Sequence, residues 1–155
     1  MTDAEKLLHL ARNRGAIIAT AESCTGGMIA AALTDIPGSS DVVDRGFVTY
    51  SNAAKIEMLG VPERLIKEYG AVSEEVARVM AEGALRQSNA TVTVAVTGIA
   101  GPGASEFKPE GRVCFGLATE AETTVETQEF GSIGRAKVRQ ATVDHALRLL
   151  HHALA

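Results

Sequence analysis

The chain has 155 residues, which fits a single domain over residues 1–155, and its 46% hydrophobic and 22% charged residues are typical of a globular protein. Aromatic residues make up only 4% and the net charge is −4, which argues against a stacking platform for single-stranded nucleic acid and against a basic surface for phosphate backbones. No apolar run reaches the roughly 18 residues of a membrane span and no basic leader precedes the first element, which predicts a cytoplasmic protein with no membrane or nucleic-acid partner.

The first half of the chain alternates between helical and strand patterns. Apolar residues recur at helical spacing over residues 3–14, with Asp3 as a candidate cap and Gly15 just past the end. The next predicted elements are a buried strand at 16–20, a buried helix at 25–36, a strand at 45–50 and short helices at 51–60 and 62–70. Strands that alternate with helices in this way are typical of parallel sheets.

The second half of the chain adds the clearest helix and the clearest strand. Residues 73–87 form an amphipathic helix that Ser73 can cap, and residues 90–98 are a continuous buried strand. A hairpin of strands at 112–119 and 123–130 and an amphipathic helix at 133–154 complete the chain. We therefore predict an α/β fold of about five strands, mainly parallel, with helices on both faces and with the hairpin making the sheet mixed.

Three predicted strands end in the same way. The first runs into "AESCTGG", the second into "SNAAK" and the third into "GIAGPG", so each apolar run gives way to small, hydroxylated or glycine residues. In open α/β sheets, ligands bind beyond the carboxyl ends of the strands. If the three strands are parallel, their polar ends converge, which predicts a functional site at that edge. Thr97 and Gly98 end the third strand there, and the glycines that follow are not a Walker loop because no GK[ST] comes after them.

Ser23 is the first candidate nucleophile. It lies just after the first strand, near the start of the next helix, where the N–H groups of Cys24, Thr25 and Gly26 would be unpaired. Such groups can bind an anion or stabilise a developing oxyanion, and glycine lets a ligand approach the backbone closely. The alternative is that Ser23 only caps the helix and that the glycines only allow close packing.

A serine nucleophile needs a base, and Lys55 is the best candidate. The four histidines lie on the two terminal helices, where solvated positions are the simpler interpretation. Lys55 lies in the first turns of the helix after the second strand, and desolvation can lower the pKa of a lysine enough for general-base work. Tyr50 ends that strand and is a candidate to relay a proton or hold the substrate. A surface lysine and a rim aromatic are the alternatives.

The two cysteines, Cys24 and Cys114, form no CxxC motif, so neither a zinc site nor a disulfide framework is predicted. Cys24 is the competing nucleophile, because a helix N-terminus favours a thiolate. It has no histidine nearby in the sequence, and small buried cysteines are common. We therefore expect Cys24 to pack against the site rather than to react.

Arg135 lies in the first turn of the last predicted helix, where the helix dipole disfavours a cation. The position is explained if an anion binds between the helix N-terminus and the guanidinium group. The alternative is an exposed arginine. Further along the same helix, a solvated basic face is the interpretation for Lys137, Arg139 and Arg148.

Four long segments, "TAESCTGG", "GSSDVVDRGFVTYSNAAK", "GAVSEEVA" and "VAVTGIAGPG…KPEGRV", resemble the C-terminal domain of the competence/damage-inducible protein CinA. The resemblance keeps their order and extends from about Leu7 to His145. It implies a three-layer α/β/α domain. Stand-alone members of the family include nicotinamide mononucleotide deamidases, so it also implies hydrolysis of that carboxamide to nicotinate mononucleotide and ammonia, with no metal or organic cofactor. The N-terminal molybdopterin-binding-like domain of full-length members, with its activities, is expected to be absent.

The resemblance also carries the family's functional positions onto this sequence. They map onto Ser23, Ser40, Tyr50, Lys55, Thr97 and Arg135. Ser23 would attack the amide with Lys55 as base, and Ser40, Thr97 and Arg135 would position the ribose and phosphate. Ser40 is also the alternative nucleophile. Another amidase or nucleotide hydrolase on the same scaffold, or a non-enzymatic nucleotide-binding module, remains open. By analogy we expect a homo-oligomer, with a dimer favoured.

Overall fold

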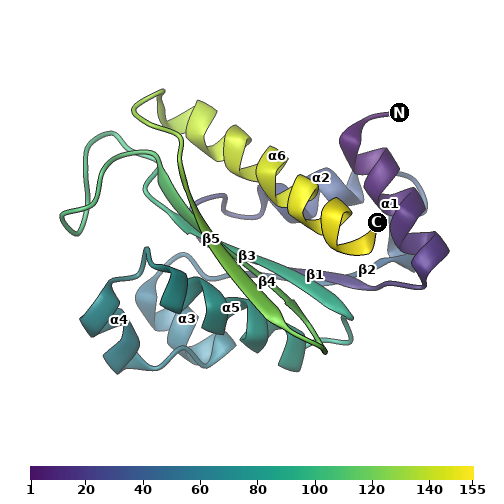
Figure 1. Ribbon diagram of the computed structural model, residues 1–155, viewed down its shortest axis with the longest axis horizontal. Helices are drawn as coiled ribbons and strands as arrows, with labels where there is room; N and C mark the ends of the chain where they lie inside the picture. The colour runs from purple at the N-terminus through teal and green to yellow at the C-terminus, as the bar shows by residue number, and fades with distance from the viewer.

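A five-stranded sheet forms the centre of the computed structural model, which describes residues 1–155 (Figure 1). The spatial order of the strands is β2-β1-β3-β4-β5. Their bounds are Ile18–Glu22 for β1, Val43–Val48 for β2, Val92–Gly98 for β3, Arg112–Thr119 for β4 and Thr123–Glu129 for β5. β1 pairs in parallel with β2 and β3, whereas β4 pairs antiparallel with β3 and β5. β4 alone therefore runs against the others, which confirms the mixed, mainly parallel sheet.

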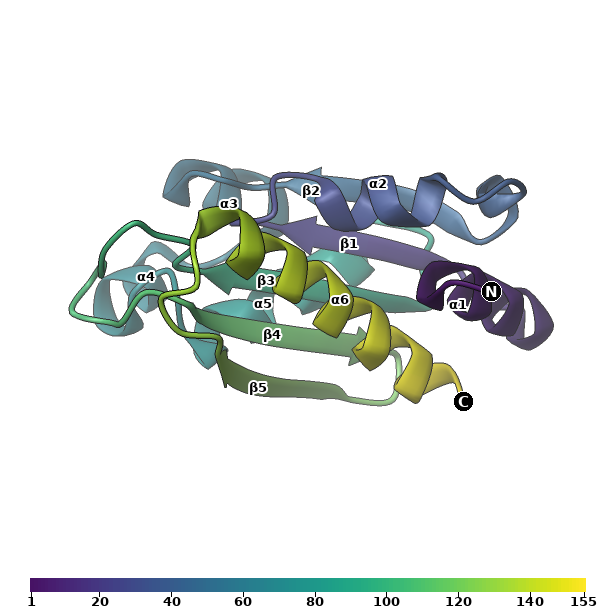
Figure 2. The ribbon, with the colours of Figure 1, turned by 90° about the horizontal axis from the view of Figure 1, so that it is seen from above.

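Helices cover both faces of the sheet, so the three-layer α/β/α arrangement is confirmed (Figures 1 and 2). One layer holds α1 (Asp3–Arg14), α2 (Met28–Thr34) and α6 (Arg135–Leu154), and the other holds α3 (Asn52–Leu59), α4 (Glu63–Tyr69) and α5 (Glu74–Arg86). Figure 2 shows α6 lying across β3 and β4, with which it is in contact. Each layer has its own cluster of buried apolar side chains against the sheet. None of the helices combines the length and the apolar character that crossing a membrane requires.

The predicted helices are found close to their expected bounds, and the differences lie at their caps. α1 spans the predicted residues, but its cap is Thr2, whose side chain accepts from the N–H of Glu5, rather than Asp3. Ser73 caps α5 as predicted. α2 begins only at Met28, because Gly26 and Gly27 have φ values of +58° and +110°. This left-handed backbone cannot continue a right-handed helix.

The parallel pairing brings the polar strand ends together as the sequence predicts. Glu22, the last residue of β1, pairs with Val48 at the end of β2 and with Val96 near the end of β3. β1 thus extends two residues beyond its predicted end, and β2 begins and ends two residues earlier than predicted. The residues that follow these three strands therefore lie together at the carboxyl edge of the sheet.

Candidate active site

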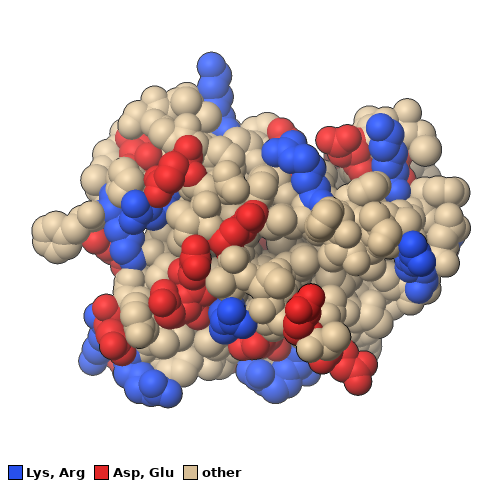
Figure 3. All heavy atoms as spheres, in the orientation of Figure 1, with Lys and Arg blue, Asp and Glu red and all other residues tan.

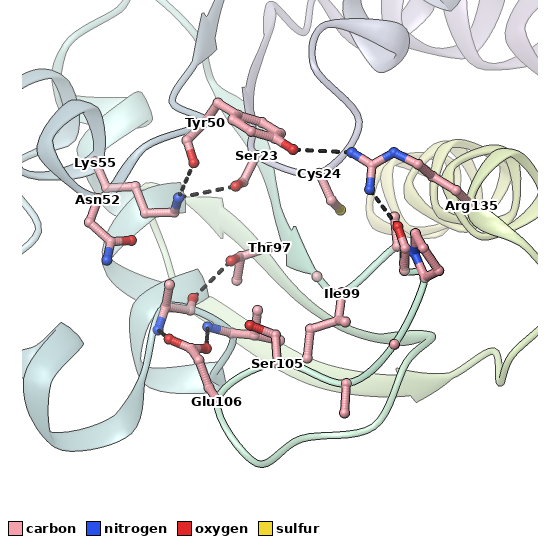
Figure 4. A pocket seen from close by; sticks show the side chains of 18 residues that line it. Ser23, Cys24, Tyr50, Asn52, Lys55, Thr97, Ile99, Ser105, Glu106 and Arg135 are labelled. Carbon is pink, nitrogen blue, oxygen red and sulfur yellow. Dashed lines mark hydrogen bonds between the residues drawn. The ribbon is translucent and has the colours of Figure 1, made fainter.

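A pocket of about 420 Å³ lies at the carboxyl edge of the parallel strands (Figure 4). Its wall comes from the segments that follow β1, β2 and β3, from the start of α3, from the α4–α5 connection and from the start of α6. Its lining includes Ser23, Cys24, Tyr50, Asn52, Lys55, Ala71, Val72, Thr97, Gly98, Glu106 and Arg135. No group of three or more His, Cys, Asp or Glu side chains is arranged to hold a metal ion.

Ser23 and Lys55 are in direct contact on the floor of this pocket. The Nζ of Lys55 is 3.0 Å from the Oγ of Ser23, and it also donates to the carbonyl oxygens of Thr49 at 3.0 Å and Tyr50 at 3.1 Å. Lys55 is 1% exposed and Ser23 8% exposed. Burial lowers the pKa of the Lys55 amine, because the charged form loses its hydration. A neutral lysine amine has two N–H groups and one lone pair. When the two N–H groups donate to the carbonyls of Thr49 and Tyr50, the lone pair faces the Ser23 hydroxyl.

The backbone holds both members of this pair in place. The N–H of Ser23 donates to the carbonyl of Val96 at 3.0 Å, which continues the β1–β3 pairing one residue past the strand. The N–H of Thr49 donates to the carbonyl of Glu22 at 2.8 Å, which does the same for β2. α3 then starts at once, capped by the side chain of Ser51, and its second turn directs Lys55 inward. Side chains fixed by the sheet in this way are preorganised for a reaction.

Glu22 holds the turn behind Ser23 and was not identified from the sequence. Its carboxylate is 1% exposed and accepts from the hydroxyl of Thr25 at 2.5 Å and from the N–H groups of Ile29 at 2.8 Å and Ala30 at 3.0 Å. It therefore supplies the N-terminal cap that α2 lacks at Gly27. The sequence signal was an acidic residue just before the start of a helix, although here it acts from inside the strand.

The predicted oxyanion donors are only partly available. The N–H of Gly26 donates to the carbonyl of Ser23 at 3.1 Å, so it is already used. The N–H groups of Cys24 and Thr25 donate to no backbone carbonyl. The Thr25 hydroxyl is committed to Glu22, and neither Thr25 nor Gly26 lines the pocket. Of the three predicted donors, only the N–H of Cys24 is therefore both unpaired and part of a residue that lines the pocket.

Cys24 lines the pocket but is poorly suited to be a nucleophile. It is 5% exposed, and burial raises the pKa of its thiol to about 12. The expected effect of a helix N-terminus is absent because the turn separates Cys24 from α2, which starts at Met28. Its Sγ instead lies against Gly98, where a Cβ would come within 3.1 Å of it. Cys24 thus packs against the end of β3.

We expect Cys24 in the folded protein to react with iodoacetamide at pH 8 at least about a hundredfold more slowly than a cysteine in an unfolded peptide. The thiolate is the reactive form, and with a pKa near 12 it becomes populated only as the pH rises toward that value. Mass spectrometry of tryptic peptides over time measures the rate. The same protein in guanidinium chloride is the control and should react fully. Rapid labelling of Cys24 in the native state would contradict this assignment.

Tyr50 reaches across the pocket toward Arg135 (Figure 4). Its hydroxyl accepts from the Nη2 of Arg135 at 3.1 Å, and the Nη1 of Arg135 donates to the carbonyl of Gly101 at 2.6 Å. The bond between Tyr50 and Lys55 is made by the tyrosine carbonyl, not by its hydroxyl. The predicted proton relay through Tyr50 is therefore not the arrangement found. Tyr50 instead supplies a main-chain acceptor to Lys55 and a ring that spans the opening.

Thr97, Gly98 and Glu106 build the opposite wall. The Thr97 hydroxyl donates to the carbonyl of Ala71 at 2.8 Å, so it ties the end of β3 to the α4–α5 connection. A Cβ on Gly98 would lie 2.6 Å from Val113, so no other residue fits there without movement. Glu106 accepts from the N–H of Ala71 at 3.0 Å and anchors the loop after β3. Glu106 could not be identified from sequence patterns, because its partner Ala71 lies in the α4–α5 connection.

Ser40 is not brought to the site. It is exposed in the short 3₁₀ helix Ser39–Asp41, which precedes β2 and lies at the amino edge of the sheet. Ser23 lies at the opposite, carboxyl edge, after β1. Because β1 and β2 are parallel, the start of one strand and the end of the other are separated by the length of the strands. Within this chain, Ser23 therefore lines the pocket and Ser40 does not.

Two residues of α6 differ from the solvated positions expected of them. His145 packs edge-on against Phe115, with ring centroids 4.7 Å apart, and its Nε2 contacts the carboxylate of Glu126. Arg139 is half-buried and donates to the main chain of the turn behind Ser23. On the face shown in Figure 3, the remaining basic side chains are scattered among acidic ones rather than gathered into one basic surface.

The comparisons with known proteins agree with the resemblance seen in the sequence. The family model of the CinA C-terminal domain matches residues 2–154. The chain is 48% identical, over 94% of its length, to a putative competence-damage inducible protein of Caldicellulosiruptor bescii, and 53% identical, over 90%, to a CinA-like protein of Mycobacterium sp. (strain MCS). It spans about a third of the length of these two relatives, 36% and 34%.

Solved structures match over nearly their whole length. The crystal structure of competence/damage inducible protein CihA from Agrobacterium tumefaciens is 48% identical, with a TM-score of 0.91, and the match covers 99% of this chain and 96% of that one. The structure of a competence or damage-inducible protein from Enterobacter asburiae is 31% identical with a TM-score of 0.95 and the same coverage. The chain therefore belongs to the CinA C-terminal domain family.

Proposed function

We propose that the protein is a serine amidohydrolase that converts the carboxamide of nicotinamide mononucleotide to the carboxylate, with release of ammonia. The observation that carries the proposal is the 3.0 Å contact between the buried Lys55 amine and the Ser23 hydroxyl in the pocket. A pocket of about 420 Å³ is within the range of small-molecule sites, roughly 300–1,000 Å³. The substrate follows from the family resemblance and from the anion-binding groups at the mouth.

The reaction begins with the attack of the Ser23 Oγ on the carboxamide carbon. Its proton passes to the lone pair of the Lys55 Nζ, and the carbonyl oxygen becomes an oxyanion that the free N–H group of Cys24 can bind. Lys55 then gives the proton to the leaving nitrogen, the C–N bond breaks and ammonia departs, which leaves an ester on Ser23. A water molecule attacks this ester with Lys55 again as base. The acid is released, and the proton returns to the Ser23 oxygen.

The start of α6 supports binding of the phosphate end of a nucleotide. Gly134 precedes this helix and provides no side-chain cap, and no acidic residue lies in the first turn. Arg135 lines the pocket there and bridges Tyr50 and Gly101. A helix N-terminus and a guanidinium group together favour an anion. Binding energy from a phosphate at this mouth would be remote from the amide that reacts on the floor.

The test is ammonia release by the purified protein from nicotinamide mononucleotide, measured beside nicotinamide, nicotinamide riboside and glutamine. We expect turnover of the mononucleotide with a kcat/KM at least about a hundredfold above that for the riboside, because only the former carries the phosphate. Equal rates for the two would contradict the phosphate assignment. A folded protein that hydrolyses another amide of the panel in preference would overturn the substrate, and one inert toward all of them would favour a binding role.

A further inference from the structure

Arg139, a residue of α6, forms hydrogen bonds to the turn that follows Ser23. Its Nε donates to the carbonyl of Cys24 at 3.0 Å and its Nη2 donates to the carbonyl of Thr25 at 3.2 Å. The guanidinium group therefore holds two consecutive carbonyls of the turn at once. Its planar array of donors suits such a forked contact, which a lysine cannot reproduce.

The position of Arg139 is itself fixed. Its neighbours on α6, Val138, Thr142 and Val143, are all buried against the rest of the molecule. At Gly26, a Cβ would lie 3.4 Å from the Nη2 of Arg139, and the φ of +58° disfavours any side chain there. The glycine thus leaves the guanidinium group free to lie against the turn.

The turn is held from two sides by groups of opposite charge. On one side, the Glu22 carboxylate binds the Thr25 hydroxyl and the first N–H groups of α2. On the other side, Arg139 binds the carbonyls of Cys24 and Thr25. The Glu22 carboxylate accepts hydrogen bonds and the Arg139 guanidinium group donates them, so the two contacts together fix the conformation of the turn.

The orientation of these peptides determines where their N–H groups point. The N–H groups of Cys24 and Thr25 both donate to no backbone carbonyl. Thr25 is fully buried and does not line the pocket, so only the N–H of Cys24 belongs to a residue of the pocket wall. Arg139 holds the carbonyl of that same residue.

We propose that Arg139 is a positioning residue that holds the turn after Ser23 in the conformation in which the N–H of Cys24, a residue of the pocket lining, serves as an oxyanion donor for the reaction at Ser23. This inference rests on the proposed role of Ser23 as nucleophile, and it does not depend on which amide is the substrate. Arg139 does not itself line the pocket. It acts through the carbonyls of Cys24 and Thr25.

The test compares Arg139→Lys and Arg139→Met with wild type in two reactions. The first is turnover of nicotinamide mononucleotide. The second is the labelling of Ser23 by a fluorophosphonate probe, in which the serine oxygen bonds to phosphorus and fluoride leaves, so the phosphoryl oxygen needs the same donors. We expect both variants to lose at least about tenfold in kcat and in labelling rate, with KM within about threefold, since loss of one oxyanion donor costs roughly a hundredfold or more.

Two controls separate positioning from folding. Arg148→Met removes an exposed arginine of the same helix and should leave both rates unchanged. Arg139→Ala should regain part of its labelling rate when guanidinium ion is added at non-denaturing concentration. The melting temperature of the variant should stay constant on this addition, which shows that the rate does not recover through restored folding. Methionine keeps the apolar stem of the side chain at 139.

Three outcomes would overturn the proposal: unchanged kcat and labelling in both Arg139 variants, a loss confined to KM, or equal losses in Arg148→Met. The proposed function fails in a different way. Wild type that is labelled at Ser23 but releases no ammonia from nicotinamide mononucleotide overturns the substrate and leaves the role of Arg139 to be decided by the labelling rates. Wild type that is not labelled at Ser23 overturns both.

Discussion

Lys55→Met is expected to lower kcat/KM for amide hydrolysis at least about a hundredfold, the usual contribution of a general base. Methionine has about the length of the lysine stem and suits a position that is 1% exposed, but it offers no lone pair to the Ser23 hydroxyl 3.0 Å away. Lys55→Arg should be equally inactive, because a guanidinium group keeps its charge and cannot accept the proton. Initial rates of ammonia release measure both variants.

The pH dependence of the wild-type rate tests the same assignment. The neutral amine is the active form, so kcat/KM should rise with pH through the pKa of Lys55. Burial lowers that pKa, so the rise should come at a lower pH than for an ordinary lysine, and Lys55→Met should lose it. Lys67→Met, which changes an exposed lysine of α4 paired with Glu63, is the matched control and should keep both rate and profile. A Lys55→Met enzyme within tenfold of wild type would contradict the role of Lys55 as base.

The pair of Ser23 and Lys55 was predictable because it depends on local signals that a parallel sheet combines. Each residue follows an apolar run, and apolar runs separated by helices predict parallel strands whose ends share one edge. The pairing of Glu22 with both Val48 and Val96 shows that the three ends are level. The pattern that indicates parallel strands, rather than any single residue type, therefore allowed the position of the pocket to be predicted.

Ser40 was assigned from the family resemblance rather than from strand direction, and the structure does not bring it to the pocket. The segment before β2 and the segment after it are close in the sequence, and both contain small hydroxylated residues. Ser40 precedes both the predicted strand at 45–50 and β2, which starts at Val43, so strand direction places it at the amino edge. Only the position of the strand relative to its neighbours separates the two edges. Hydroxyl content and proximity in the sequence do not.

Glu22 and Arg139 could not be assigned from the sequence for a different reason. Glu22 binds N–H groups of α2 and Arg139 binds carbonyls of the turn, and backbone donors and acceptors have no signature in the sequence. The charge pattern of the last helix predicted a solvated position for Arg139, but the residue is half-buried. That pattern gives no information on what lies opposite the helix face, because contacts between distant segments depend on how the layers pack.

Ser23→Ala is expected to lower kcat for amide hydrolysis at least about a thousandfold, since it removes the atom that forms the ester. The cavity left by one hydroxyl is small, and the N–H of Ser23 keeps its bond to Val96, so the fold and the binding of substrate should persist. Ammonia release gives the rate, and calorimetric binding of the uncleaved substrate shows that the pocket is intact. Ser40→Ala, at the opposite edge of the sheet, should stay within about twofold of wild type.

The double variant Ser23→Ala with Lys55→Met decides whether the two residues act as one unit. Residues that serve a single chemical step are strongly non-additive, because the second loss removes a partner that is already useless. The double variant should therefore be no more than about threefold slower than Ser23→Ala. A loss equal to the product of the two single losses would mean that Lys55 assists catalysis independently of Ser23. Activity that survives in Ser23→Ala and disappears in Ser40→Ala would contradict the proposed nucleophile, and with it the functional meaning of the 3.0 Å contact between Ser23 and Lys55.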